Sequence, residues 1–203
     1  MARKPADQAV HRPDILLAAA NVFRRQGYHG AKMADIAAEV DLTAGSLYHH
    51  FPDGKQQILL EVLNQGLDKV TAEVRAIVEN DTFSPAEKLR GAVYAHVVAL
   101  TRNVSVAAAL VFETRTMLSY PSTRDSYLQR RDIFENLYHQ VVEEGIEAGI
   151  FRKVDVRIFV KSLLGAHNWV GVWYRDGGRL SGEAIAEEMA TSFLAALMCP
   201  LEI

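Results

Sequence analysis

Apolar residues recur at helical spacing almost from one end of this chain to the other, and that periodicity limits the fold more than any other feature. Ile15, Leu16, Ala19, Val22 and Phe23 form the first such stripe. No segment alternates convincingly with the period of two that indicates a strand. The periodicity therefore predicts an all-α fold.

Start and stop signals divide this periodicity into about nine helices. Ser84-Pro85-Ala86-Glu87 combines a capping box with proline at the first helical position, and Gly27 after Arg24 and Arg25 is a C-terminal stop signal. The first helix should end near Gly27, and the others are expected at about residues 33–40, 44–51, 53–79, 84–103, 105–118, 122–148, 154–175 and 181–198. We find no internal repeat and no low-complexity segment.

The composition is that of an ordinary globular chain, with 203 residues, 49% of them hydrophobic and 23% charged, and a formal charge of −3. The single cysteine, Cys199, excludes an internal disulfide and a multi-cysteine zinc site. Residues 1–14 contain charged side chains and no apolar run, so we expect no secretory signal. His96, Arg102 and Lys161 interrupt the longest apolar stretches, so we expect no membrane span and a cytoplasmic location.

Residues 30–51 contain a short helix, a break at residues 41–43 and a second short helix, which is the helix-turn-helix pattern. A corner in an all-α core would give the same spacing. The second helix favours DNA binding, because Leu47 and Phe51 can anchor one side while small and polar residues occupy the other. The outward side carries Gly45, Ser46, Tyr48, His49 and His50. In such motifs the N-terminal residues of the second helix read the major groove.

Residues 12–62 resemble the N-terminal domain of the TetR family of bacterial transcriptional repressors. The matching residues are Ile15–Phe23, Gly27-Tyr28, Met33–Ala37, Gly45–Phe51 and Lys55. The resemblance implies a helix-turn-helix DNA-binding domain in residues 1–55, hereafter the head, and a ligand-binding and dimerisation domain in residues 56–203, hereafter the body. It also implies that two helices near the C-terminus form a four-helix bundle between two protomers.

By this resemblance, the residues expected to contact DNA are Lys32, Thr43, Ala44, Gly45, Ser46, Tyr48, His49, His50 and Lys55. Tyr48, His49 and Lys55, helped by Thr43, should position the head on phosphates, while Gly45, Ser46 and His50 should lie nearest the bases. Adjacent residues on a helix point about 100° apart, so His49 and His50 are not expected to share a metal ion.

Three positions depart from the family pattern. The family often has threonine where Ala31 stands, and Lys32 is expected to supply a phosphate contact in its place. It often has lysine where Ala44 stands, which removes one base contact. The turn before Lys55 is one residue longer than usual, which changes the reach of this lysine.

Polar residues on apolar helical faces between residues 80 and 180 are the candidate ligand contacts. They are His96, Glu113, Arg115, His139, His167, Asn168, Trp169, Trp173, Arg175 and Arg179. Each has an alternative interpretation: the histidines as hydrogen-bonded core residues, the tryptophans as core or dimer packing, and the arginines as surface ion pairs.

Residues 169–181 resemble a TetR branch that regulates fatty-acid, phenylacetate and steroid-ring catabolism and responds to acyl-CoA thioesters. The resemblance implies an apolar channel, lined by residues 105–118 and 159–170, with Arg115, Arg175 and Arg179 as cations for the phosphates. The rival effector is a lipophilic or cationic drug, as in repressors of efflux pumps, with Glu113 as the anionic anchor.

The sequence thus predicts a repressor that binds a palindromic operator as a homodimer and is released by a small hydrophobic effector, with no cofactor, metal or membrane partner. Motifs for phosphate loops, metalloproteases and serine hydrolases are lacking, so we expect no enzyme. A helical protein-interaction module without DNA binding is the alternative from another class. The charge is unevenly distributed: residues 1–55 carry seven basic and six acidic side chains, and residues 56–203 carry fifteen and nineteen.

Overall fold

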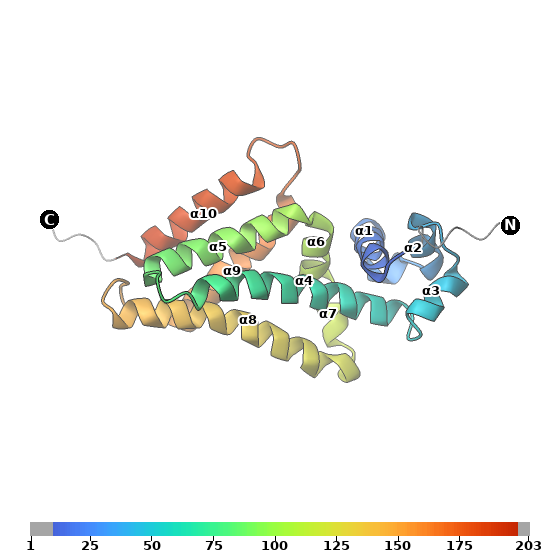
Figure 1. Cartoon of the computed structure of the whole chain (residues 1–203), viewed down its shortest axis with the longest axis horizontal. Helices are drawn as coiled ribbons and strands as arrows, with labels where there is room; N and C mark the ends of the chain where they lie inside the picture. Colours follow the sequence, from blue (N-terminus) through green and yellow to red (C-terminus); the bar gives the residue numbers. More distant parts are fainter. Residues whose placement is uncertain (1–9, 199–203) are drawn as a thin grey trace.

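The computed structural model describes residues 10–198, which form ten α-helices and, apart from one isolated bridge between Phe151 and Met198, no β-structure (Figure 1). The helices are α1 Arg12–Gly30, α2 Met33–Glu39, α3 Ala44–His50, α4 Lys55–Val78, α5 Pro85–Arg102, α6 Val104–Phe112, α7 Thr114–Leu118, α8 Pro121–Glu147, α9 Val156–Trp173 and α10 Gly182–Leu197. Cys199 and residues 1–9 lie outside the described part. The all-α prediction is confirmed.

The molecule is elongated, with α1, α2 and α3 at one end and the remaining helices extending from them (Figure 1). The first three helices enclose a small core that includes Phe23, Ile36, Leu47 and Phe51, all almost fully buried. Gly27 leaves the helical conformation with a φ of 68°, so the predicted stop signal appears as a kink inside α1. The long helix α4 then continues from the head into the body.

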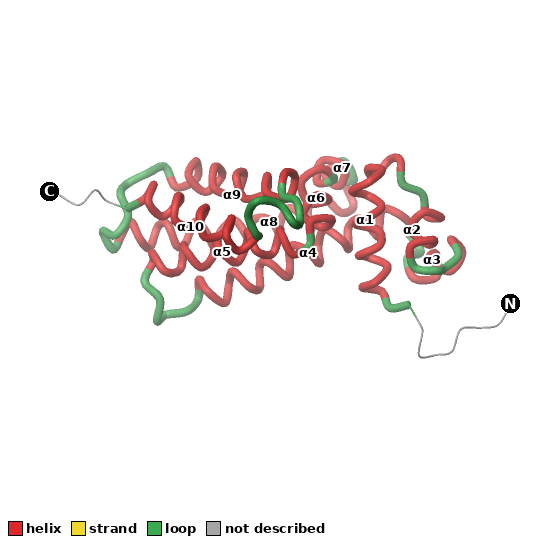
Figure 2. Tube along the Cα trace, turned by 90° about the horizontal axis from the view of Figure 1, so that it is seen from above, coloured by secondary structure: helices red, strands yellow, loops and turns green. Residues whose placement is uncertain are grey.

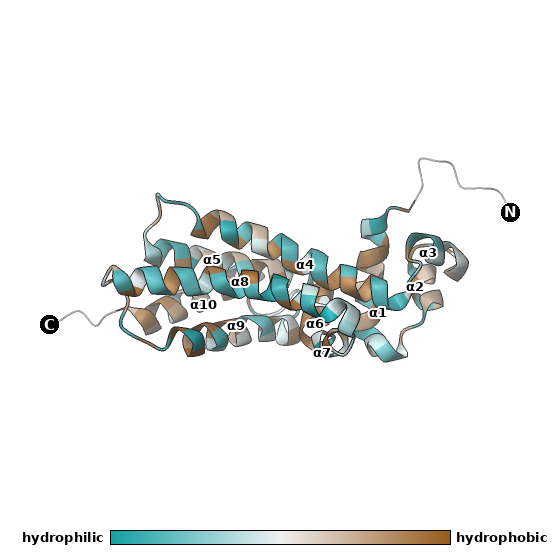
Figure 3. Cartoon of the chain, turned by 90° about the horizontal axis from the view of Figure 1, so that it is seen from below, coloured by the Kyte–Doolittle hydropathy of each residue, from teal (hydrophilic) through white to brown (hydrophobic). Residues whose placement is uncertain are grey.

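The body consists of helices that lie alongside one another (Figure 2). Between them they bury the apolar stripes predicted from the sequence. Figure 3 shows these stripes as hydrophobic bands on α4 and α8 beside hydrophilic ones. Lys88 on α5 is buried and pairs with Glu144 on α8 at 3.0 Å. The capping box predicted at Ser84 and Glu87 is present at the start of α5.

The single helix expected over residues 105–118 is instead two helices, α6 and α7, which meet at Glu113. Thr114 Oγ1 donates to the carbonyl oxygen of Leu110, four residues earlier, at 2.5 Å. This type of back-bonding bends helices because the hydroxyl competes for the carbonyl. Residues 10–198 therefore form ten helices rather than the nine expected.

Across residues 10–198, no single helix is both long and apolar enough to span a membrane. Only α5 and α6 taken together meet the criteria of length and composition, and they are bent by 102° relative to each other.

Candidate nucleic-acid interface and ligand cavity

The short helix α3 carries six of the nine predicted DNA-contacting residues: Ala44, Gly45, Ser46, Tyr48, His49 and His50. Thr43 caps it: Oγ1 accepts the backbone N–H of Ser46 at 3.1 Å. Leu47 is fully buried, whereas Tyr48 is 51% exposed. Gly45 and His49 are also exposed, and Ala44, Ser46 and His50 are partly buried. The helix thus has the anchored side and the open side that the sequence predicts.

Arg12 at the start of α1 fixes the C-terminal end of α3, a contact that sequence reasoning missed. Its guanidinium donates to the carbonyl oxygen of His50 at 2.6 Å and forms a two-point ion pair with Glu61 on α4. The same group lies 4.2 Å from the ring centre of Phe51. A cation at the C-terminus of a helix interacts favourably with the helix dipole. Arg12 therefore joins α1, α3 and α4 into one unit.

The turn between α3 and α4 depends on Gly54, which has a φ of 67°. A Cβ atom at this position would lie 3.3 Å from Cε1 of Tyr48, so the glycine also leaves room for the tyrosine ring. The ring of Tyr48 therefore lies against the turn from which α4 begins.

Lys55 lies differently from the expected phosphate contact. Its Nζ donates to the carbonyl oxygens of Tyr28 at 2.6 Å and Ala31 at 2.7 Å, and it lies 4.4 Å from the ring centre of Tyr28. Partial burial lowers the pKa of Lys55, while the charge of Glu113 opposes this shift. Lys55 thus stabilises the end of α1. Lys32, by contrast, is exposed at the start of α2.

Glu113, the anionic anchor expected for a cationic effector, is engaged by groups of the protein itself. Its Oε1 accepts the backbone N–H of Tyr28 at 2.9 Å, and its Oε2 accepts the hydroxyl of Thr116 at 3.2 Å. The hydroxyls of Tyr28 and Tyr120 are 3.4 Å apart. Burial raises the pKa of the Tyr28 phenol, and the charge of Glu113 adds to the shift. The break between α6 and α7 is therefore tied directly to the head.

A cavity of about 780 Å³ lies between α1, α4, α5, α6, α8 and α9. Its apolar walls include Val62, Leu100, Val106, Leu110 and Phe134. The head helix α1 contributes to the same wall, through Pro13, Leu16 and Leu17. A ligand in this cavity would touch the DNA-binding head directly.

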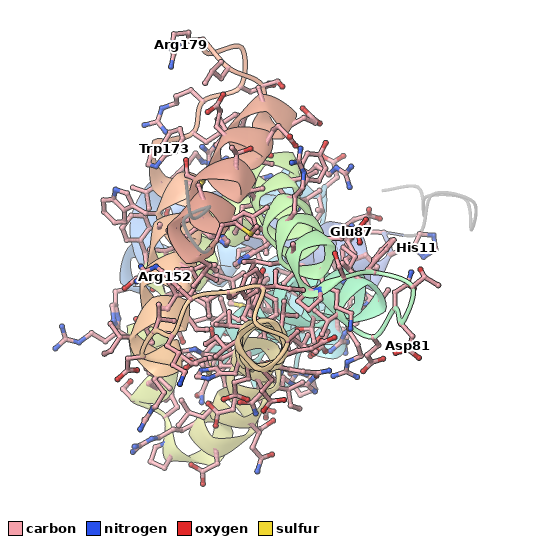
Figure 4. The ribbon with its side chains drawn as sticks, turned by 90° about the vertical axis from the view of Figure 1, so that its left-hand side faces the viewer. His11, Asp81, Glu87, Arg152, Trp173 and Arg179 are labelled. Carbon is pink, nitrogen blue, oxygen red and sulfur yellow. The ribbon has the colours of Figure 1, made fainter. Side chains whose placement is uncertain are left out.

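Of the predicted ligand residues, only His96 and Asn168 line this cavity. Trp169 and Trp173 are 55% and 46% exposed on α9, outside it. Arg115, Arg175 and Arg179 are exposed and also lie outside it. Figure 4 places Trp173 at the periphery and Arg179 on the connection between α9 and α10. Outside the cavity, these side chains can face solvent or a second protomer, as the alternative interpretations of the tryptophans and arginines allow.

Four cations that the sequence reasoning missed line the cavity instead: Lys69, Arg102, Arg131 and Lys161. Lys161 pairs with Glu135 at 2.9 Å. The other three make no hydrogen bond or ion pair with any residue in the described range 10–198. Lys69 lies on α4, before the segment of residues 80–180 in which ligand contacts are expected.

His96 belongs to a buried polar cluster beside the cavity. Its Nδ1 lies 3.2 Å from Nδ1 of His167 and 3.4 Å from the hydroxyl oxygen of Tyr138. The hydroxyl of Tyr138 donates to the carbonyl oxygen of Ala92 at 3.0 Å. Burial lowers the pKa of His96 to about 3, and that of His167 well below its ordinary value. Both rings are therefore neutral at physiological pH. The described residues contain no group of three or more His, Cys, Asp or Glu that could hold a metal ion.

Two family models match this chain. The one described as bacterial regulatory proteins, tetR family, matches residues 15–62, and the tetracyclin repressor-like C-terminal domain matches residues 82–197. The chain belongs to the TetR family. This assignment makes it a DNA-binding transcriptional regulator, and it accounts for the open side of α3 and for the helical body together.

Relatives of known structure and function share most of its length. The transcriptional repressor KstR2 of Mycobacterium tuberculosis is 32% identical over 180 residues, which cover 87% of this chain and 88% of the repressor. The structure of that ketosteroid regulator covers 95% of this chain and 98% of its own, with a TM-score of 0.85. AibR, solved with isovaleryl coenzyme A and operator DNA, is 27% identical and covers 93% of this chain and 98% of its own, with a TM-score of 0.77.

Proposed function

We propose that this TetR-family protein is a repressor that binds operator DNA as a homodimer and releases it when an acyl-CoA thioester occupies the cavity. We infer this class of effector from the apolar walls of the cavity together with its three unpaired cations. The similarity to KstR2, a ketosteroid regulator, and to AibR, which was solved with isovaleryl coenzyme A, supports the same class. The proposed activity is regulatory, not enzymatic, and its place is the cytoplasm, where bacterial DNA lies.

The three unpaired cations suit the phosphates of coenzyme A. Phosphate oxygens accept charge-assisted hydrogen bonds from arginine and lysine, and an unpaired guanidinium loses no existing partner when it binds them. Lys69, Arg102 and Arg131 come from α4, α5 and α8, so one polyanion could contact three helices of the body. The acyl group would then enter the apolar part of the cavity.

A cationic drug fits this cavity less well. The anchor expected for it, Glu113, is 8% exposed and accepts the N–H of Tyr28. The carboxylates that line the cavity are Glu73 and Glu135. Glu135 pairs with Lys161, whereas Glu73, four residues after Lys69 on α4, makes no ion pair within residues 10–198. Within residues 10–198 the lining therefore has three unpaired cations against one unpaired carboxylate, and this balance favours an anion over a cation.

On the DNA side, we propose that Gly45, Ser46 and His50 lie nearest the bases and that Tyr48 and His49 contact phosphates. Lys32, Thr43 and Ala44 would complete the interface, with the head ending where α4 begins at Lys55. The two heads of the dimer would occupy two half-sites of a palindrome. An effector that fits a different head arrangement better would shift the population and lower operator affinity.

The test is operator affinity with and without ligand, using DNA that flanks the gene of this protein. Isovaleryl-CoA, octanoyl-CoA and decanoyl-CoA would be compared with the free acids and with a cationic dye. We expect release by at least one thioester and none by the acids or the dye. Arg102→Ala and Arg131→Ala should weaken thioester binding, whereas the exposed Arg115→Ala should not. Release by the dye alone would contradict the proposal.

A further inference from the structure

His96 has one nitrogen that the protein leaves without a partner. Its ring is 3% exposed and is held in place by His167, Tyr138 and the edge-to-face contact with Phe134, at 4.9 Å between ring centres. All of its hydrogen bonds within residues 10–198 use Nδ1. Nε2 of His167 has no hydrogen-bond partner and is completely enclosed by protein atoms. Nε2 of His96 also has no partner within residues 10–198 but is not enclosed in this way, and His96 lines the cavity. The free nitrogen therefore faces the cavity.

The geometry points to a neutral oxygen-binding subsite at His96: we infer that the effector carries a hydroxyl or carbonyl group on its hydrophobic part and hydrogen-bonds it to Nε2. This inference rests on the proposed function and adds to it, because a saturated acyl chain would leave Nε2 without a partner. Burying a polar group without a hydrogen-bond partner costs free energy. A ligand that supplies a partner to Nε2 avoids this cost and should therefore bind more tightly.

The tautomer of the histidine pair decides which oxygen group fits. A hydrogen bond between the two Nδ1 atoms requires that one of them carries a proton and the other accepts it. If His96 carries it, Nε2 is a bare acceptor and suits a hydroxyl donor; if His167 carries it, Nε2 is a donor and suits a carbonyl or a hydroxyl oxygen. Because burial keeps His96 neutral, this subsite does not select an anion. Negative charge would be bound elsewhere, at Lys69, Arg102 and Arg131.

The two kinds of contact can serve one ligand. His96 and Arg102 lie on the same helix, six residues apart, which corresponds to about 9 Å along the axis. Arg131 and Phe134 similarly lie close together on α8. One molecule with an anionic end and an oxygen-bearing hydrophobic end can therefore span both regions of the cavity.

The experiment compares octanoyl-CoA with analogues that carry a keto or a hydroxyl group at successive positions along the chain. Calorimetry would measure their affinities for the wild-type protein, for His96→Phe and for His96→Gln. We expect at least one oxygenated analogue to bind the wild type about fivefold to tenfold more tightly than octanoyl-CoA. His96→Phe should abolish this preference, and His96→Gln, which keeps a polar end group, should retain part of it.

Thr114→Val is the matched control, because Thr114 also lines the cavity but its hydroxyl is already bonded to Leu110 and Tyr127. This variant should keep the preference. The inference is overturned if octanoyl-CoA binds as tightly as every oxygenated analogue, or if His96→Phe retains the preference while thermal unfolding shows it to be folded. If no thioester binds at all, the proposed function itself fails, which is a different result.

Discussion

Tyr48 is a residue whose replacement should change DNA recognition without changing the stability of the fold. It is half-exposed on α3, while its neighbour Leu47 is fully buried. We expect Tyr48→Ala to weaken operator binding with almost no change in melting temperature. Leu47→Ala, the control, should lower the free energy of unfolding by about 2–5 kcal/mol. Gel shifts and thermal unfolding of both variants test this, and an equal loss of stability in the two would show that Tyr48 is a core residue.

His96 and His167 should make the stability of the protein depend on pH. Their pKa values are lowered in the folded state by burial, so below about pH 6.5 the unfolded chain binds more protons than the folded one. Stability should therefore be complete above that pH and fall as the pH is lowered towards about 3 for His96. The slope is up to about 1.4 kcal/mol per pH unit for each histidine.

Urea unfolding at several pH values between neutral and pH 5 measures this dependence. The His96→Gln variant should lose less stability on acidification than the wild type, because it lacks one of the two titrating groups. Identical slopes for both proteins would contradict the assignment of the acid sensitivity to this pair.

At the scale of elements, the junction of α6 and α7 should hold the head in place. Glu113→Ala leaves the buried N–H of Tyr28 without its partner, which should cost about 1–3 kcal/mol of unfolding free energy. Glu113→Gln keeps an acceptor oxygen and should cost less. Arg115→Ala, two residues away and exposed, is the control and should be neutral. Equal stability of the Ala and Gln variants would show that the hydrogen bond contributes nothing.

Most of the helices could be predicted from local sequence, because caps and periodicity act over a few residues. Ser84 caps the helix that it was predicted to cap, and Thr43 and Ser181 also cap their helices through side chains that accept a backbone N–H three residues later. The contacts that organise the sites could not be predicted in this way. Arg12 and Glu61 are 49 residues apart, and Tyr28 and Glu113 are 85 apart. Such pairs leave no periodic signal, so the role of Glu113 and the cavity cations became visible only in the folded chain.

At the scale of the whole molecule, α9 presents apolar side chains to solvent. Ile158, Trp169 and Trp173 are each about half exposed or more. Exposed apolar residues along one helix are typical of an interface, and a homodimer would cover them. We expect Trp169→Arg to give a monomer in analytical ultracentrifugation and to lose operator affinity, with the head still folded by circular dichroism. Arg175→Ala should remain dimeric, and a dimeric Trp169→Arg variant would place the interface elsewhere.

The position of α1 has one further consequence. Pro13, Leu16 and Leu17 belong both to the head and to the wall of the cavity, so an effector in the cavity would contact a helix of the DNA-binding head. Thermodynamic reciprocity then requires that operator DNA weaken effector binding by the same factor by which the effector weakens DNA binding. The dissociation constant of an effector measured on the free protein should therefore be lower than the effector concentration that releases a promoter-bound dimer in the cell, because the DNA-bound dimer binds the effector more weakly.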